Sequence, residues 1–237
     1  MGAWPKWVFA ASLTLASLYA LVCWGLYACG RAMLPDEGLA PTTYRAPASI
    51  RAQLTAVEFD GTQSIPRLNP FTAVPALLMA ATQPSSDRER GLRILSHASR
   101  VASLRAPAIR GNLRRHLADM ARAIVISRHW SSGQIGNTLL AESHFGRSAR
   151  GVEQAALAYY GLPANQLRAE ESLALVTLMR GPRYYDPACH RERFEARYLR
   201  AAEATEAKAP NLALDRAMER MLQTADCGTT RNRATES

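Results

Sequence analysis

The chain has 237 residues, enough for one globular domain together with a membrane anchor. Hydrophobic residues make up 48% and charged residues 21% of the sequence, so wholesale disorder and a collagen-like structure are excluded. Four cysteines are too few for a disulfide scaffold, and the net charge of +9 favours an anionic partner. Charge alone does not choose among nucleic acid, anionic lipid and a phosphorylated substrate.

The segment from Trp7 to Gly30 has 24 residues and no charge. As a helix it would extend ~36 Å, which is enough to cross a hydrocarbon core of ~30 Å. Tryptophan and tyrosine lie near both of its ends, as in the interfacial belts of membrane helices. The sequence therefore predicts an uncleaved transmembrane helix, with a cleaved signal peptide and a lipoprotein processed at Cys29 as alternatives. The short head is expected in the cytoplasm, so that a single-pass protein of the inner membrane carries its bulk on the periplasmic or extracellular side.

The spacing of the cysteines and histidines does not indicate a metal-binding site. The chain contains no CxxC or HExxH motif, and its five histidines are scattered. Cys23 and Cys29 fall in the predicted span, where they are expected to be small packing residues. Cys189 and Cys227 would lie in an oxidising compartment and could pair, although spacing in sequence does not decide this.

Beyond the anchor the sequence divides into a stem, a helical domain and a tail. Five prolines in residues 31–72 predict an extended stem, with at most a short strand near Leu54–Phe59. Apolar residues at steps of three and four then predict helices without strand pairing, joined at Phe145–Gly151 by a turn, so the domain is expected to be all-α. The predicted helices are Val74–Ala81, Arg88–Leu104, Leu113–Arg128, Gln134–Glu142, Val152–Tyr160, Ala169–Met179 and Arg191–Ala207. The expected divisions are 1–30 for head and anchor, 31–72 for the stem, 73–210 for the domain and 211–237 for the tail.

Four sequence elements follow one another in the block Ser131–Pro187. They read SSGQIGNTLLAESHFG, RSARGVEQAALAYYGLP, LRAEESLALV and PRYYDP. In this order they resemble the C-terminal half of glycosyltransferase family 51, the membrane-anchored peptidoglycan glycosyltransferases that occur alone or in penicillin-binding proteins. The family patterns are S-K-x-x-I-L-x-x-Y-L-N-x-x-Y-F-G, G-x-x-G-I-x-x-A-A-x-x-Y-F-G-K, L-T-x-x-E-A-A-x-L-A and P-x-x-Y-x-P. The resemblance implies a lysozyme-like helical fold, a role in bacterial cell-wall synthesis, and the family's glutamate at Glu171.

The upstream motifs of this family are degenerate in the sequence. The helix leading to the first motif is recognisable in Val74–Ala81, but Thr82 stands in place of the catalytic glutamate and Gln83 in place of its aspartate neighbour. The family's G-G-S-T-I-T-Q-Q motif is almost entirely lost near Gly91–His97. The segment between these two motifs, a mobile lobe in the family, is also much shorter.

The family's R-K-x-x-E element corresponds to the run from Arg115 to Asp119. The arginine is kept, the lysine becomes His116, and the glutamate becomes Asp119. The resemblance therefore implies that Arg115, His116 and Asp119 bind substrate, with the arginine and the histidine holding a phosphate and the aspartate orienting them. On a helical surface, basic residues at this spacing are equally compatible with a solvated face.

Glycan extension requires a carboxylate that takes a proton from the acceptor sugar, and cationic groups that stabilise the departing pyrophosphate. Threonine is too weak a base for this near neutral pH, and losing general-base help alone costs ~10²–10⁴ in rate. The sequence therefore predicts a catalytically inactive relative that binds membrane-borne lipid II, glycan strands or cell-wall synthesis proteins. No cofactor and no nucleic-acid partner are expected.

Two other hypotheses stay open at this point. In the first, the protein is an active peptidoglycan glycosyltransferase in which Asp119 or Glu142 is a displaced base, and a divalent cation could then assist it. In the second, it is a helical structural or interaction protein whose resemblance to the family reflects only similar packing.

Overall fold

The computed structural model describes residues 6–59, 65–73, 87–206 and 210–223. In these residues the regular structure is helical apart from one short hairpin, which confirms the predicted all-α class. The chain forms two units, each described here by itself. The first comprises Met1–Ala40 and Ile65–Ser131, and the second comprises Pro41–Ser64 and Ser132–Ser237.

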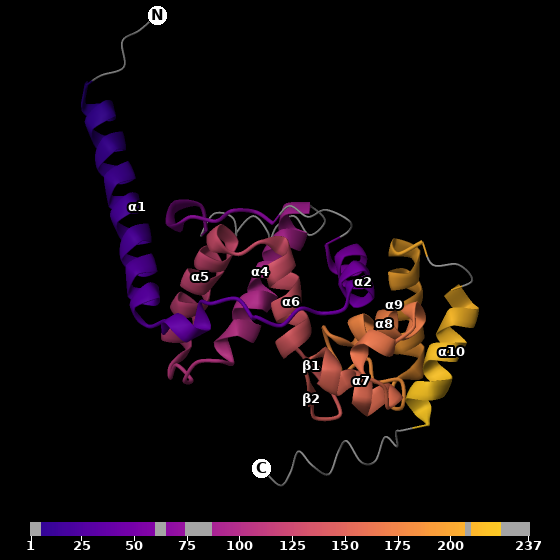
Figure 1. The fold of residues 1–237 in the computed structure, drawn as a ribbon. Helices are drawn as coiled ribbons and strands as arrows, with labels where there is room; N and C mark the ends of the chain where they lie inside the picture. Colours follow the sequence, from indigo (N-terminus) through magenta and orange to yellow (C-terminus); the bar gives the residue numbers. More distant parts are fainter. Residues whose placement is uncertain (1–5, 60–64, 74–86, 207–209, 224–237) are drawn as a thin grey trace, which may run out of the picture. The chain divides into compact units, whose positions relative to one another are not determined.

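The first unit is built around α5. It contains α1 (Lys6–Ala32), the 3₁₀ helix η1 (Asp36–Gly38), α4 (Asp87–Ser103) and α5 (Asn112–His129). Helix α5 packs against both α1 and α4 (Figure 1). Its buried face carries Ala118, Ala121 and Ile124, whereas Leu113, one of the apolar residues whose spacing predicted the helix, is exposed. Helices α4 and α5 thus lie where the hydrophobic pattern predicted them.

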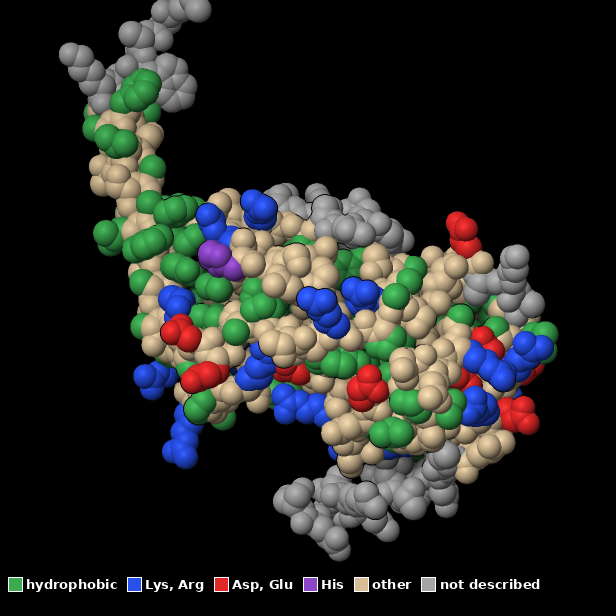
Figure 2. Space-filling model, viewed as in Figure 1, with side chains coloured by type: hydrophobic (Ala, Val, Ile, Leu, Met, Phe, Trp, Pro, Cys, Tyr) green, Lys and Arg blue, Asp and Glu red, His purple; other side chains and the backbone are tan. Residues whose placement is uncertain are grey.

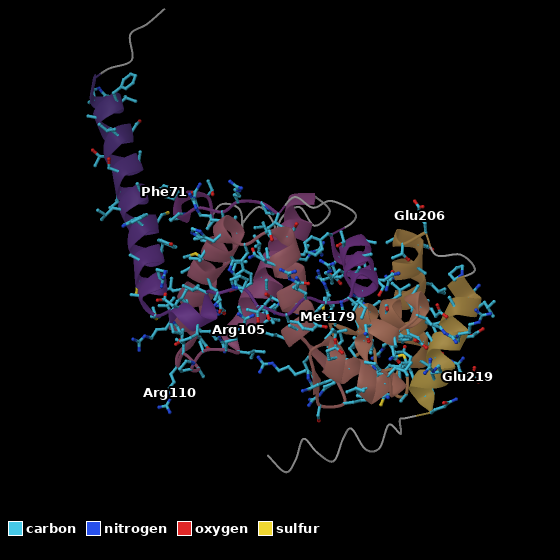
Figure 3. The ribbon with its side chains drawn as sticks, in the orientation of Figure 1. Phe71, Arg105, Arg110, Met179, Glu206 and Glu219 are labelled. Atoms are coloured by element: carbon cyan, nitrogen blue, oxygen red, sulfur yellow. The ribbon has the colours of Figure 1, made fainter. Side chains whose placement is uncertain are left out.

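Helix α1 is largely uncovered by protein. Its segment Trp7–Ala32 has 26 residues and is long and apolar enough to cross a membrane, a property that a signal sequence shares. Hydrophobic side chains stand exposed along it (Figure 2). Farther along, Cys23 is buried and the Tyr19 hydroxyl donates to the carbonyl of Phe71 at 2.6 Å (Phe71 is labelled in Figure 3). The helix is therefore free in its first turns and packed against the rest of the unit in its last ones.

The closest approach of α1 to α5 depends on a glycine. A Cβ atom on Gly30 would lie 2.3 Å from the carbonyl oxygen of Leu117. Alanine normally favours a helix by ~1 kcal/mol over glycine, but here the clash is expected to lower the free energy of unfolding of Gly30→Ala by about 1–3 kcal/mol. Thermal unfolding in detergent micelles measures it. Gly25→Ala is the control, because a Cβ there meets nothing within 4 Å; equal behaviour of the two variants would contradict this packing.

The second unit is built around α8 (Ala169–Leu178), whose residues from Glu171 onward are all buried. Helix α8 contacts α2, α9 and α10. Helices α8, α9 and α10 lie side by side in Figure 1. The other elements are α2 (Ala48–Glu58), α6 (Ser132–Glu142), β1 (His144–Gly146), β2 (Ala149–Arg150), α7 (Val152–Tyr160), the 3₁₀ helix η2 (Ala164–Gln166), α9 (Arg191–Ala204) and α10 (Pro210–Leu222).

Two segments outside the predicted domain are helical, and the first of them had been expected to be extended. Residues 48–58 were expected to be extended or to include a short strand, but they form α2, whose Ile50 and Leu54 are buried. These two side chains are four residues apart and so lie on one helix face, which packs on α8. The expected tail begins with the amphipathic helix α10, which buries Leu214 and Met218. The predicted helix Val74–Ala81 lies outside the described residues, and the domain divisions at 30, 72 and 210 stay predictions.

The turn expected at Phe145–Gly151 is instead a β-hairpin, so the expectation of no strand pairing was wrong here. Strands β1 and β2 pair antiparallel. The two residues at its tip, Arg147 and Ser148, both have positive φ angles, of 49° and 60°. This is the backbone of a tight hairpin turn whose twist matches that of the strands. The hairpin is invisible to periodicity because each strand is only two or three residues long.

Candidate functional site

Arg115 and His116 lie on the first half of α5, and both side chains are exposed. One guanidinium nitrogen of Arg115, Nη2, donates to Oδ1 of Asn112 at 3.3 Å. An exposed arginine held only by a neighbouring amide on its own helix remains available to an anionic group. The structure therefore leaves these two residues accessible, as the substrate-binding prediction requires.

Asp119, in contrast, is engaged inside the first unit. Its Oδ1 accepts a hydrogen bond of 2.6 Å from Nη1 of Arg122, whose side chain is only 2% exposed. The same nitrogen donates to the carbonyl of Ser99 at 3.3 Å, and the Ser99 hydroxyl donates to the carbonyl of Asp119 at 2.9 Å. This carboxylate is the counter-ion of the buried guanidinium, and leaving a buried charge without its counter-ion is costly. Asp119 is thus built to neutralise Arg122, and this argues against its acting as a displaced base.

This assignment predicts effects of different size on the free energy of unfolding for two substitutions on α5. Asp119→Asn leaves Arg122 buried without its counter-ion and is expected to lower the free energy of unfolding by about 1–3 kcal/mol. Arg115→Ala removes an exposed side chain and should change it by no more than about 0.5 kcal/mol. Chemical denaturation of the purified protein measures both. A neutral Asp119→Asn would show that Arg122 does not depend on this carboxylate.

Glu142 is the last residue of α6, in the second unit. Its side chain is 13% exposed, and its Oε2 lies 3.7 Å from Nη2 of Arg150 on β2. The contact ties the end of α6 to the hairpin. A carboxylate with this little exposure and an arginine beside it is well placed to stabilise the hairpin and poorly placed to reach a substrate proton.

Glu171, which matches the family's glutamate, stabilises the start of α8. Its Oε2 accepts the backbone N–H of Arg168 at 2.9 Å, the bond that a carboxylate makes at the third position of a helix. Its other oxygen pairs with Arg220 on α10, and Arg220 also donates to the carbonyl of Tyr160 at 3.5 Å. Glu171 is 1% exposed, so it joins α7, α8 and α10 rather than contacting a ligand.

Tyr159, another position in register with the family, is also a core residue. Its hydroxyl donates to the carbonyl of Phe145 at 2.8 Å, and the guanidinium of Arg147 lies 4.0 Å from the centre of its ring. Burial raises the pKa of the Tyr159 hydroxyl well above its ordinary value, so it stays protonated as a donor. The segment that carries the resemblance thus accounts mainly for the packing of the second unit.

A small hollow opens at the N-terminus of α6. It has a volume of about 170 Å³ and is lined by Arg51, Leu54, Thr55, Phe59, Ser132, Gly133 and Gly136. Ser132 stands at the lysine of the family's S-K element. The first backbone N–H groups of a helix and a nearby arginine both favour a negatively charged group. Sequence analysis missed Arg51 because α2 was not expected.

The sequence also gave no indication of Glu58. This carboxylate, at the end of α2, is 5% exposed and pairs with both Arg180 and Arg197. Arg197 in addition donates from Nε to the carbonyl of Thr177 at 2.9 Å. The three charged groups join α2, the segment after α8, and α9. A signal was present in the spacing of Ile50 and Leu54, which places Glu58 in line with them on a helix.

Thr82 and Gln83 lie outside the described residues, so their place in a site stays a prediction. The described residues contain no cluster of three or more potential metal ligands. Cys189 is disulfide-bonded and Cys23 and Cys29 are free, whereas Cys227 lies outside the described residues.

Comparison with known proteins gives a consistent set of relatives. A family model described as transglycosylase matches residues 99–206. Penicillin-binding protein 1A of Mycobacterium tuberculosis is 33% identical over 102 residues, which cover 42% of this chain and 12% of that protein. A biosynthetic peptidoglycan transglycosylase of Acinetobacter baumannii is 31% identical over 88 residues, which cover 35% and 39%. Penicillin-binding protein 1B of Vibrio cholerae is 32% identical over 87 residues, which cover 35% and 11%. The chain thus spans less than half the length of each of these relatives.

Proposed function

Because residues 99–206 belong to the transglycosylase family, glycosyltransferase family 51, we propose that this chain is a peptidoglycan-glycosyltransferase-like protein that binds lipid-linked cell-wall precursors without polymerising them. The observation that carries the proposal is the ion pair between Asp119 and Arg122. The aspartate at the family's glutamate position in the R-K-x-x-E element neutralises the buried Arg122. The first motif of the family is expected at Thr82, and the family match begins only after it, at residue 99.

Binding is supported by basic side chains that lie exposed. Arg115 and His116 are exposed on α5, and Arg51 lines the hollow at the start of α6. Each of the two arginines could contact a pyrophosphate, because arginine binds phosphate oxygens through two parallel hydrogen bonds. A protein that keeps such contacts but has lost its base would hold a lipid-linked donor and leave it intact.

The test compares polymerisation and binding of lipid II in the full-length chain. With the Acinetobacter baumannii enzyme as the active control, polymerisation by this chain is expected to be at least ~10²–10⁴-fold slower. Lipid II binding is expected to persist and to weaken in Arg115→Ala. Polymerisation at a rate near that of the control would overturn the proposed inactivity.

The same assay separates the proposal from an enzyme with a displaced base. If this chain polymerises lipid II, Asp119→Asn and Glu142→Gln should each abolish the activity when the corresponding carboxylate is the base. Activity that survives both substitutions would exclude the two residues.

We further propose that α1 anchors the protein in the inner membrane with the bulk of the chain outside the cytoplasm. The support is the length and apolar surface of this helix. A reporter enzyme that works only outside the cytoplasm, fused after Arg31, is expected to be active, and the protein should keep Met1 or Gly2 at its N-terminus. A lipid-modified Cys29 at the N-terminus would instead support a lipoprotein.

A further inference from the structure

A second hollow lies within the second unit, and none of its lining residues belongs to the candidate site described above. Its volume is about 220 Å³. Four helices and the residue after α9 contribute to it. The lining residues are Gln53 from α2, Ala169, Glu170 and Leu173 from α8, Tyr198 from α9, Thr205 just after α9, and Ala213 from α10.

Two polar groups on this hollow are buried without a partner in the structure. The hydroxyl of Tyr198 and the amide oxygen Oε1 of Gln53 have no hydrogen bond, and Tyr198 is 0% exposed. Buried polar groups in proteins are almost always paired, so two such groups on one hollow indicate a site for something that pairs with them. Burial, with Glu170 nearby, raises the pKa of the Tyr198 hydroxyl, which therefore stays protonated and can donate.

The charges around the hollow restrict the class of ligand. Glu170 is the charged residue among those that line it, so an anion is repelled. A cation would meet the positive end of the α8 dipole, since Ala169 and Glu170 are in the first turn of that helix, and would leave the Tyr198 hydroxyl without an acceptor. A neutral hydroxyl group can accept from Tyr198 while another donates to Gln53 or Glu170.

The size of the hollow restricts the ligand further. A cavity of about 150 Å³ is sufficient for a benzene ring, so 220 Å³ accommodates a six-membered ring that carries hydroxyl groups. Ala169, Leu173 and Ala213 supply apolar surface for the faces of such a ring. We propose that this hollow is a binding site for a neutral polyol the size of one sugar ring, held by Tyr198, Gln53 and Glu170.

The proposal does not rest on the proposed function, because none of the lining residues is among those proposed to bind the precursor, which are Arg51, Arg115 and His116. The probe is methyl α-glucopyranoside, a neutral ring with four hydroxyl groups, titrated against the full-length protein in detergent micelles and followed by saturation-transfer NMR. A ligand of this size is expected to bind with a dissociation constant of about 1 mM. Tyr198→Phe should weaken binding about tenfold, since it removes one hydrogen bond from a buried donor.

Control variants distinguish a loss of probe binding at this hollow from a general effect of a substitution on the protein. Tyr44→Phe removes a hydroxyl that donates to Glu153 at 2.8 Å elsewhere in the unit and should bind the probe as the unchanged protein does. Glu219→Gln neutralises an exposed carboxylate on α10 (labelled in Figure 3) and is the control for Glu170→Gln, which should weaken binding. Leu173→Trp fills the hollow and should abolish binding, and it replaces Tyr198→Phe as the test if that variant does not fold.

Three results would overturn the proposal. The first is an absence of probe binding at concentrations well above 1 mM. The second is binding that the substitutions at Tyr198, Glu170 and Leu173 leave unchanged. The third is tighter binding of butylammonium or butyrate, which are the charged probes of similar apolar size, than of the neutral ring. A failure of the lipid II assays would leave these measurements unaffected, because they follow a different site and ligand.

Discussion

Replacing Glu58 by alanine is expected to lower the free energy of unfolding by about 3–5 kcal/mol. The carboxylate is 5% exposed and is the counter-ion of both Arg180 and Arg197, whose side chains are 29% and 21% exposed. Removing it leaves two largely buried positive charges close together without compensation. The substitution also creates a small cavity at the end of α2, which adds to the loss.

Urea denaturation of the purified chain in micelles measures this effect, with Glu195→Ala as the control. Glu195 pairs with Arg191 one turn away on α9, at 2.7 Å, but its side chain is 31% exposed and that of Arg191 is 63% exposed. Such a surface pair contributes only about 0.3–0.5 kcal/mol. A similar, small effect of both substitutions would show that Glu58 is not the charge that holds α2 to the rest of its unit.

Helices α2 and α10, which contain Glu58 and Arg220, were the least predictable part of the fold. The sequence predicted Val152–Tyr160 to the residue, because an Ala-rich segment ends there at Gly161, which adopts the left-handed conformation with a φ of +64°. Residues 48–58 have only two strongly buried apolar positions, and the surrounding prolines indicated an extended chain. What makes this segment helical is its packing on α8, a contact distant in sequence that local patterns do not contain.

The candidate site, like α2, could be predicted from the sequence only in part. Patterns located Arg115, His116 and Asp119 on one helix, and the structure bears out that placement. They did not show that Asp119 neutralises Arg122, since an arginine on an amphipathic helix is normally placed in solvent. Burial of Arg122 follows from its position between Ala118 and Ile124, on the face of α5 that other helices cover. Long-range pairs such as Glu58 with Arg180, which are 122 residues apart, likewise require the structure.

The substitution Thr82→Glu is expected not to restore glycan polymerisation. If the sequence register is correct, it returns a carboxylate to the position of the family's catalytic glutamate. A general base contributes ~10²–10⁴ in rate only when it lies within hydrogen-bond reach of the proton that it removes. The second family motif, near Gly91–His97, and the segment before it are reduced in this sequence, so the groups that would position the acceptor hydroxyl are missing.

The lipid II polymerisation assay tests this with Thr82→Gln as the matched control, which has the same shape but cannot take up a proton. Both variants are expected to polymerise lipid II no faster than the unchanged protein. Asp119 gives an independent reason for this result, because the position equivalent to the family's second glutamate already neutralises Arg122 and is not available to assist a restored base. Polymerisation by Thr82→Glu and not by Thr82→Gln would mean that the first glutamate alone was lost, and that the remaining cleft still aligns donor and acceptor.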